Sequence, residues 1–460
     1  MRVLRGSSAI ATVGMVVLGL HSAQADSASP FTLRAAILYA RAHQPSIAAA
    51  HARVDVARAQ AEIPNAAFGV RLAGAAEIVA GTNNNTTASY ATLGILDVGR
   101  IGGTPANAPT SWRPDASTLV GLSAHKELYD FGRLEAQADS FEALVHAADE
   151  TANAAQLDLD LYVEESFYAV LGAKAVLAAS EAAVTRARTH RDFAQARVTA
   201  QLMPPIELTR AEADFERYEV DRIRAQGALA VAQAVLAAAI GADAPAVDAS
   251  ADDVTHSTPP DGDAVLHAVQ DRAPELRAAR ALLLAQQTLT AAIRAELRPD
   301  LSLSAELTGR AGGAKVAANP SPTGSGWLPD VPNWDALVVF SWPIYDRVVT
   351  ARAEASQRQE AVRVAELAQV KEQLRTIAQR TLVELDVARA ALPALQRAVD
   401  AAQANNDQAD ARFRGGLGTA VELSDAEALL TDAQIQLAVG QFQLSRARAR
   451  LARVLAESIP

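Results

Sequence analysis

The sequence predicts a mainly helical chain built from two copies of one unit, each joining a long coiled-coil helix to a pair of membrane-type strands. Three observations predict this mixed, mainly α fold class. "ARVTAQLMPPIEL" at residues 196–208 aligns without a gap with "ARFRGGLGTAVEL" at residues 411–423. Long runs of helix-forming residues precede both motifs. Shorter stretches of alternating apolar and polar residues precede those runs.

The first 25 residues have the pattern of a secretory signal peptide. Arg2 and Arg5 give a basic start, residues 9–20 form a short apolar stretch, and Ala-Gln-Ala at residues 23–25 supplies small side chains for cleavage. We therefore assign residues 1–25 to a signal peptide and expect an exported protein.

The composition excludes several classes of protein. A hydrophobic content of 50% rules out a mainly disordered chain. A net charge of -11 argues against nucleic acid and anionic lipid surfaces as partners. The absence of cysteine excludes disulfides and thiolate metal sites. After the signal peptide we find no run of ~18 uninterrupted apolar residues, so any membrane crossing is expected to use strands.

Further matches extend the duplication over most of the chain. Tyr129 of "ELYDFGR" corresponds to Tyr345 of "PIYDRVV", and Pro45 corresponds to Pro274. Between the copies lies a stretch rich in proline and aspartate that is typical of a linker. The predicted units are a first structural repeat over 26–240, a linker over 241–262 and a second repeat over 263–460.

Residues 133–196 and 347–411 are predicted to form two long helices. Both are rich in Ala, Leu, Glu, Gln and Arg and nearly free of glycine, and the second carries a coiled-coil seam of apolar residues at 3-4 spacing. At 1.5 Å per residue each helix is roughly 100 Å long. Pro393 lies inside the second helix and is expected to kink or break it.

Shorter helices and two turns complete the helical part. A turn, here called a tip, follows each long helix. The predicted tips are residues 197–206 and 412–419, and the predicted shorter helices are residues 31–63, 206–240, 263–297 and 420–456.

Four stretches alternate between apolar and polar residues, which is typical of strands with one apolar face. In "LSLSAELTG", for example, Leu303 lies on the apolar face and Ser304 on the polar face. Turn-rich loops join the strands of each pair. The predicted strands are residues 66–80, 115–128, 300–310 and 334–344.

The tryptophans lie in or beside these strands and loops. We assign Trp112, Trp334 and Trp342 to the aromatic girdle of a membrane β-barrel, whose strands need ~9–11 residues. Four strands cannot close a barrel around a pore, so several chains must contribute.

The sequence resembles the TolC-like outer membrane efflux proteins. The resemblance rests on the duplicated half, the "YDFGR" and "YDR" junctions and the "RFRGGLGTAVELSDAEA" turn, and it covers essentially the whole mature chain. It implies a homotrimer in the Gram-negative outer membrane, with four strands per chain in one 12-stranded barrel and the helices forming a long periplasmic tunnel.

The resemblance also implies a passive exit duct of a tripartite efflux or type I secretion system. Such a duct contacts outer membrane lipid and docks onto a periplasmic adaptor and an inner-membrane pump. The duplicated turns then form the periplasmic entrance and the adaptor docking site. The tip residues assigned to docking are Arg197, Leu202, Met203, Arg412, Arg414, Gly415, Gly416, Leu417 and Gly418.

Glu422 and Asp425 are the candidate pore-entrance residues, because the resemblance places acidic residues there. Several carboxylates around a narrow pore disfavour anions and attract cations. A capping box from Thr419 to Glu422 is the alternative role, since an acid in the first turn also stabilises a helix. In the first repeat Glu207 corresponds to Glu422, but Arg210 stands at the second acidic position.

The chain departs from the family pattern at the closed-state lock. Phe413 and Gly418 stand where the best-known member has the tyrosine and arginine of that lock. Arg412 and Arg414 are the candidates to replace these contacts.

No other chemistry is predicted. His43 and His51 share a helix but offer too few ligands for a metal site, and we find no nucleophile–base constellation. We therefore expect no catalytic residue, no cofactor and no bound metal. Two other classes stay open as alternatives. A periplasmic adaptor would have one helical hairpin and no aromatic-flanked strands, and an exported hydrolase would use the helices only as a scaffold.

Overall fold

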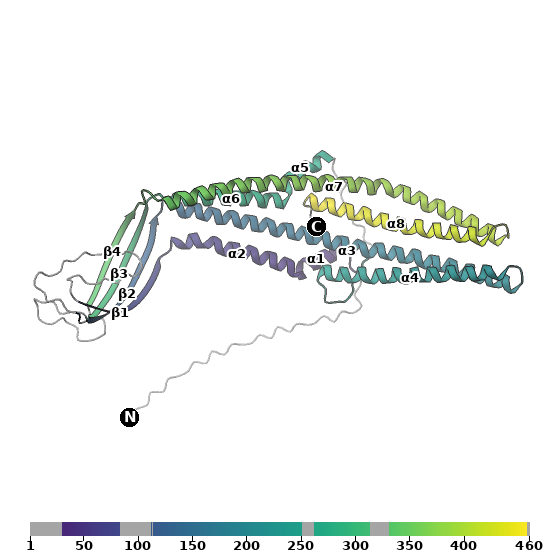
Figure 1. Cartoon of the computed structure of the whole chain (residues 1–460), viewed down its shortest axis with the longest axis horizontal. Helices are drawn as coiled ribbons and strands as arrows, with labels where there is room; N and C mark the ends of the chain where they lie inside the picture. Colours follow the sequence, from purple (N-terminus) through teal and green to yellow (C-terminus); the bar gives the residue numbers. More distant parts are fainter. Residues whose placement is uncertain (1–29, 83–111, 113, 251–261, 313–330, 458–460) are drawn as a thin grey trace, which may run out of the picture.

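The computed structural model describes residues 30–82, 112, 114–250, 262–312 and 331–457. They form one elongated body with a sheet at one end and two helical tips at the other (Figure 1). The predicted signal peptide and most of the two loops between strands lie outside the described residues.

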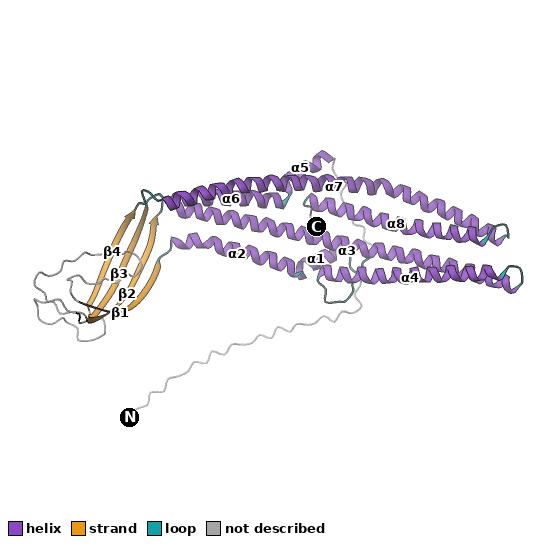
Figure 2. Cartoon of the chain, in the orientation of Figure 1, coloured by secondary structure: helices purple, strands orange, loops and turns teal. Residues whose placement is uncertain are grey.

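Eight helices make up most of this body (Figure 2). The two longest, α3 (Arg133–Thr199) and α7 (Arg347–Arg414), run from the sheet end to the tips (Figure 1). The others lie along them: α1 (Leu33–His43), α2 (Pro45–Ala67), α4 (Pro205–Ile240), α5 (Gly262–Arg272), α6 (Pro274–Ala295) and α8 (Ala420–Val454).

Both long helices begin at the residue that the sequence predicts. Each extends three residues beyond its predicted end, α3 to Thr199 and α7 to Arg414. They contain 67 and 68 residues, which makes each about 100 Å long. Asp346 caps α7, because its carboxylate accepts a hydrogen bond from the N–H of Val348 at 2.7 Å. Gly132, with φ 89, supplies the left-handed residue before α3.

Pro393 does not break α7, contrary to one of the two outcomes expected from the sequence. Proline leaves the carbonyl of Arg389, four residues earlier, without its helical partner. Both residues are exposed, so water can satisfy that carbonyl and the helix continues.

Two predicted helices are each divided into two. Residues 31–63 form α1 and the first part of α2, and residues 263–297 form α5 and α6. Each break falls just before a proline, at Gln44 with ψ 121 and at Ala273 with ψ 120. Proline disfavours helical backbone in the preceding residue but is well placed to start the next helix, which explains both breaks.

Part of the predicted linker packs against the helices. Val247 and Ala249 are buried in the core formed by α1, α3 and α4. Ala249 forms a parallel bridge with Phe31, and Lys174 Nζ on α3 lies 2.7 Å from Asp248 Oδ2. The described first part of this segment is therefore docked on the helices, while residues 251–261 lie outside the described chain.

The sheet contains β1 (Arg71–Thr82), β2 (Pro114–Tyr129), β3 (Asp300–Gly312) and β4 (Val331–Ser341). Its order is β1-β2-β3-β4 with antiparallel neighbours. The first strand is predicted from residue 66 but starts at Arg71, because α2 continues through Ala67. Likewise β4 ends at Ser341, so Trp342 lies just beyond it.

The two faces of the sheet differ in character. Residues paired across antiparallel strands share a face, so the register assigns each side chain to one side. Lys126 interrupts the apolar face, and Leu337 and Val339 interrupt the polar one. The exposed apolar face carries Leu72, Ile78, Val120, Leu122, Leu303, Leu307, Trp334, Val338 and Phe340, and the other face carries Arg71, Ser123, His125, Glu127, Ser302, Ser304, Glu306 and Asp335.

The helical cores lie along the shaft between the sheet and the tips. One core joins α1, α3 and α4, and another joins α5, α6, α7 and α8. By length and composition α3 and α4 each contain a window apolar enough to cross a membrane, which is weak evidence for a span. Both helices are alanine-rich and lie in the shaft, away from the apolar face of the sheet (Figure 1).

Candidate pore entrance at the helical tips

The two tips at the end of the shaft form the candidate functional site. One joins α3 to α4 and the other joins α7 to α8 (Figure 1). In the first tip the N–H of Leu202 donates to the carbonyl of Arg197 at 2.8 Å. In the second, the N–H of Leu417 donates to the carbonyl of Arg412, also at 2.8 Å. The duplicated motif therefore folds into a duplicated turn.

Each turn places a left-handed residue directly before its leucine. Gly416, with φ 72, adopts this conformation without steric cost. Gln201 has φ 58, so the first tip carries the strain that a side chain brings to this region. Leu202 and Leu417 project into solvent, with 68% and 79% of their surface exposed.

Other tip residues hold together the two helical hairpins, which are α3 with α4 and α7 with α8. Phe413 is only 2% exposed, and its ring lies edge-on to His190 at 4.9 Å and near Phe193 at 5.6 Å. Met203 of the first tip packs against the same cluster. The guanidinium of Arg197 lies 5.3 Å from the Phe193 ring. Arg197 and Met203, which the sequence assigns to docking, thus also anchor the first tip.

Glu422 forms the capping box of α8. The side chain of Thr419 accepts a hydrogen bond from the N–H of Glu422 at 3.2 Å, and the Glu422 carboxylate accepts one from the N–H of Thr419 at 3.3 Å. Arg412 Nη2 lies 3.7 Å from the same carboxylate and donates to the carbonyl of Leu417 at 3.3 Å. The charge of Glu422 is therefore partly offset within its own turn.

Asp425 is placed differently from Glu422. It is exposed on α8 and forms no ion pair within the described part of the chain. In the first hairpin Glu207 is half-buried and Arg210 is exposed. The charge of Asp425 is therefore less compensated than that of Glu422.

The two arginines considered for the closed-state lock bind acids of their own hairpin. Arg412 approaches Glu422, and Arg414 Nε lies 2.9 Å from Asp410 Oδ1 one turn earlier in α7. Gly418 sits tightly under this group, because an added Cβ would lie 3.1 Å from Arg412 Cβ and 3.2 Å from Glu422 Oε2. These contacts shape the second tip itself.

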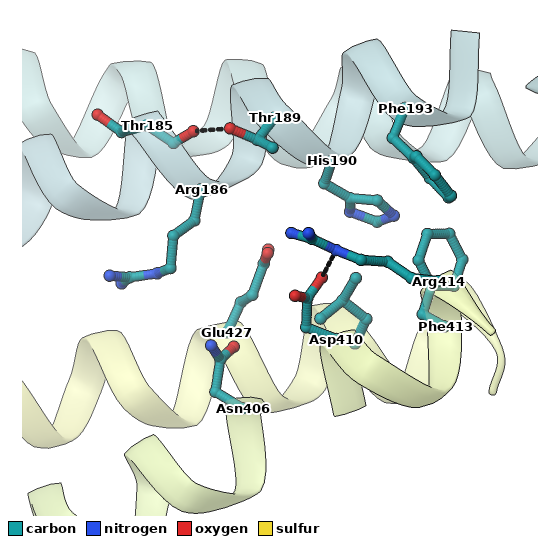
Figure 3. Close-up of a pocket in the computed structure, with 11 residues that line it drawn as sticks. Thr185, Arg186, Thr189, His190, Phe193, Asn406, Asp410, Phe413, Arg414 and Glu427 are labelled. Carbon is teal, nitrogen blue, oxygen red and sulfur yellow. Dashed lines mark hydrogen bonds and ion pairs between the residues drawn. The ribbon is translucent and has the colours of Figure 1, made fainter. Parts of the chain in front are cut away.

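A layer of buried polar side chains lies between the two hairpins, behind the tips (Figure 3). Arg186 and His190 extend from α3, and Glu427 extends from α8 toward them. Glu427 is 6% exposed and His190 is 7% exposed. Arg186 Nη2 donates to Thr431 Oγ1 on α8 at 3.0 Å. Ser424 Oγ adds a second link between the hairpins by donating to Asp214 Oδ2 on α4 at 2.7 Å.

This layer lines a cavity of about 320 Å³. Three polar atoms at its wall are buried and have no hydrogen-bond partner among the described residues. They are Arg186 Nε, His190 Nε2 and Asn406 Oδ1. The hairpins are therefore joined here by polar contacts that are only partly satisfied.

Burial shifts the pKa values of the groups in this layer. Desolvation raises the pKa of Glu427 to about 7, although Arg186 opposes the shift. Desolvation also lowers the pKa of His190, against the attraction of Asp214 and Asp410. The pKa of Arg186 is lowered for the same reason. The packed hairpins thus favour neutral Glu427 and neutral His190.

Sequence reasoning did not find this layer, although one signal for it was present. Leu423, Glu427 and Leu430 follow each other at 4- and 3-residue spacing, which puts all three on one face of a helix. Leu423 and Leu430 are buried, so the acid between them is buried too. A carboxylate on an apolar helical face is the pattern to look for.

The tryptophans lie near the ends of the sheet. Trp334 is near the loop end of β4 and 77% exposed on the apolar face, whereas Trp342 follows the other end of β4 and is 57% exposed. At ~3.3 Å per residue these positions are about 26 Å apart along the strand, close to the height of a barrel's apolar band. Trp112 is 95% exposed just before β2. Within the described residues no three His, Cys, Asp or Glu side chains are grouped to hold a metal ion.

Comparisons with known proteins agree with this arrangement. A family model described as "Outer membrane efflux protein" matches residues 37–242 and 265–457. No curated protein sequence gives a significant match to the chain.

Several solved outer membrane channels share the fold at low sequence identity. The outer-membrane channel OprN is 21% identical, with a TM-score of 0.74 over 93% of this chain and 90% of that one. The Campylobacter jejuni CmeC outer membrane channel is 13% identical, with a TM-score of 0.75 over 99% and 94%. The open state of the Neisseria gonorrhoeae MtrE outer membrane channel is 18% identical, with a TM-score of 0.69 over 92% and 88%.

Proposed function

This chain belongs to the outer membrane efflux protein family and is a TolC-like outer membrane exit duct that extends into the periplasm, and we propose that three copies assemble into one channel whose entrance is formed by the helical tips. The family consists of channels rather than enzymes. The chain therefore provides a passage, and we assign its residues to the wall and the entrance of that passage.

The observation that carries the proposal is a four-stranded sheet with two open edges. In the described sheet β1 and β4 each pair with only one neighbour, so each leaves a row of backbone N–H and C=O groups without partners. Hydrocarbon cannot satisfy these groups. Pairing β1 of one copy with β4 of the next would satisfy them, and three copies would then give a closed barrel with the apolar face toward lipid.

The helices would extend this barrel into the periplasm as a tunnel. Exposed apolar residues follow one side of α4 at helical spacing, which supports contact with a neighbouring copy. A further exposed pair lies on α7. These residues are Val220, Ile223, Val231 and Val235 on α4, and Val383 and Val387 on α7.

At the tips, docking and ion selection would fall to different residues. Channels of this family work with adaptor proteins and inner-membrane pumps in tripartite systems. We assign adaptor docking to the exposed leucines Leu202 and Leu417 and the turns around them. We assign the electrostatic character of the entrance mainly to Asp425, because Glu422 is partly neutralised by Arg412.

The mass of the detergent-extracted protein tests the assembly. We expect a membrane-derived trimer by native mass spectrometry, and single-channel conductance when it is placed in planar bilayers. A mature chain that stays monomeric and soluble without detergent would overturn the proposal.

A further inference from the structure

We propose that Glu427, Arg186 and His190 form a proton-operated latch between the two hairpins of each protomer, which loosens when Glu427 loses its proton. The inference rests on the proposed function, because it gives the latch a purpose only if the tips are the channel entrance. Its geometry is independent of that assignment.

The first support for the latch is its position between the two hairpins. Arg186 and His190 lie on the first hairpin and Glu427 and Thr431 on the second, so the layer joins two elements that have no chain connection at this end (Figure 3). Two side-chain hydrogen bonds cross between the hairpins here, Arg186 Nη2 to Thr431 Oγ1 at 3.0 Å and Ser424 Oγ to Asp214 Oδ2 at 2.7 Å. The adjoining cavity of about 320 Å³ gives Glu427 room for hydration when the hairpins part.

Charged and titratable groups face Glu427 from three helices. These groups act on the pKa of Glu427 in opposite directions, because the arginines favour its charged form and the acids oppose it. Desolvation exceeds both influences. The facing groups are Arg186 and His190 on α3, Asp214, Arg217 and Tyr218 on α4, and Asp410 on α7.

Proton linkage gives the direction of the response to pH. Burial raises the pKa of Glu427 from 4.5 to about 7, so the packed hairpins hold its proton more tightly than separated ones. The stabilisation is complete below pH 4.5 and is lost as the pH rises through 7. From pH 6 to 8, Glu427 alone would increase the ratio of separated to packed hairpins roughly tenfold.

His190 acts in the opposite sense. Its pKa is lowered in the packed state, so protonation favours separation and this effect fades as the pH rises through ~6.5. Between pH 6 and 8 His190 alone would decrease the ratio, by at most about fourfold. The whole chain should therefore show a net increase that is smaller than tenfold but at least about twofold.

Two variants, compared with the parent, make these contributions separable in the intact trimer. The chain lacks cysteine, so Thr209→Cys on α4 and Leu429→Cys on α8 allow spin labels on exposed sites of the two hairpins. Pulsed electron paramagnetic resonance on spin-diluted trimers frozen at pH 6 and pH 8 then gives the separated fraction. We expect a tenfold rise in His190→Asn, a smaller rise of at least about twofold in the parent, and a fall of at most about fourfold in Glu427→Gln.

Asp432→Asn is the matched control, because it removes an exposed acid from the same helix and should behave like the parent. A pH response that persists unchanged in Glu427→Gln, or distances that do not vary with pH in the parent and in His190→Asn, would overturn the latch. Bilayer conductance separates the two proposals. Tips that move with pH while conductance stays constant would preserve the latch and reject the tips as the entrance.

Discussion

Leu202 and Leu417 are structural equivalents, each closing its helical turn with a 2.8 Å hydrogen bond from its N–H to an arginine carbonyl and each exposing its side chain at the end of the shaft. Replacing both with Asp should weaken adaptor binding at least tenfold, because an apolar docking surface would acquire charge. Surface plasmon resonance with the purified adaptor measures the change.

Leu202→Met with Leu417→Met is the control for this pair, since it keeps the surface apolar and should retain most of the affinity. The trimer should form in both double variants, because neither side chain packs in a core. Equal binding by the Asp and Met variants would exclude the leucines from the docking surface.

The acids behind the second tip should differ in their effect on ion selectivity. Asp425→Asn should lower cation preference more than Glu422→Gln, because Arg412 lies 3.7 Å from the Glu422 carboxylate and offsets its charge. Arg412→Gln should raise cation preference by releasing that charge. Reversal potentials in a salt gradient across planar bilayers measure all three.

Capping gives this prediction a second readout. Glutamine can still accept the hydrogen bond from the Thr419 N–H, so Glu422→Gln should preserve α8, whereas Glu422→Ala should cost about 1 kcal/mol of local stability. If selectivity is the same in all of these variants while the trimer remains intact, the acids do not line the entrance.

Substitutions on the two faces of the sheet should have unequal consequences. Arg at Leu303, on the apolar face, should cost about 2–4 kcal/mol near the bilayer midplane and reduce assembled trimer. Arg at Asp335, on the polar face, should assemble normally. Asp335 is the better control than Ser304, because Ser304 is 5% exposed and lies 3.1 Å from His125 Nδ1. Similar trimer yields would mean that the faces are assigned wrongly.

Close packing between α7 and α8 can be tested at Gly440. A Cβ added there would collide with Leu395 Cδ1, the end of a flexible side chain, so Gly440→Ala should displace that side chain at a cost of about 1 kcal/mol, which the higher helix propensity of alanine partly offsets. Combining it with Leu395→Ala should remove this cost, because the collision disappears. A double-mutant cycle of thermal unfolding measures the coupling, and additive effects would contradict the contact.

The sequence was most informative where a periodic pattern is long. The 3-4 spacing of apolar residues from Leu367 onward predicts the seam of α7, and most of that seam packs in the core shared with α8. Strict alternation in β3 predicts which side chains face outward, as Leu303 and Ser304 illustrate. Such patterns sum many weak preferences, so local exceptions do not obscure them.

Features that depend on one contact between distant segments were not predictable in the same way. The docking of Asp248 on Lys174 turns a proline-rich linker into a packed segment. The interruptions before Pro45 and Pro274 depend on single residues inside otherwise helical stretches. The layer around Glu427 needs α3 and α8 to meet, and the local pattern on α8 indicates only that Glu427 is buried, not which helix covers it.

The open edges of β1 and β4 also have a kinetic consequence. A single protomer would expose two unpaired strand edges and the apolar face of the sheet before it meets a partner. Its assembly should therefore depend on how often protomers meet. At high concentration the same edges would promote irregular aggregation. At low concentration the protomer would remain unassembled for longer and would be accessible to proteases. The yield of assembled protein should therefore depend on the rate at which protomers meet relative to the rates of aggregation and proteolysis.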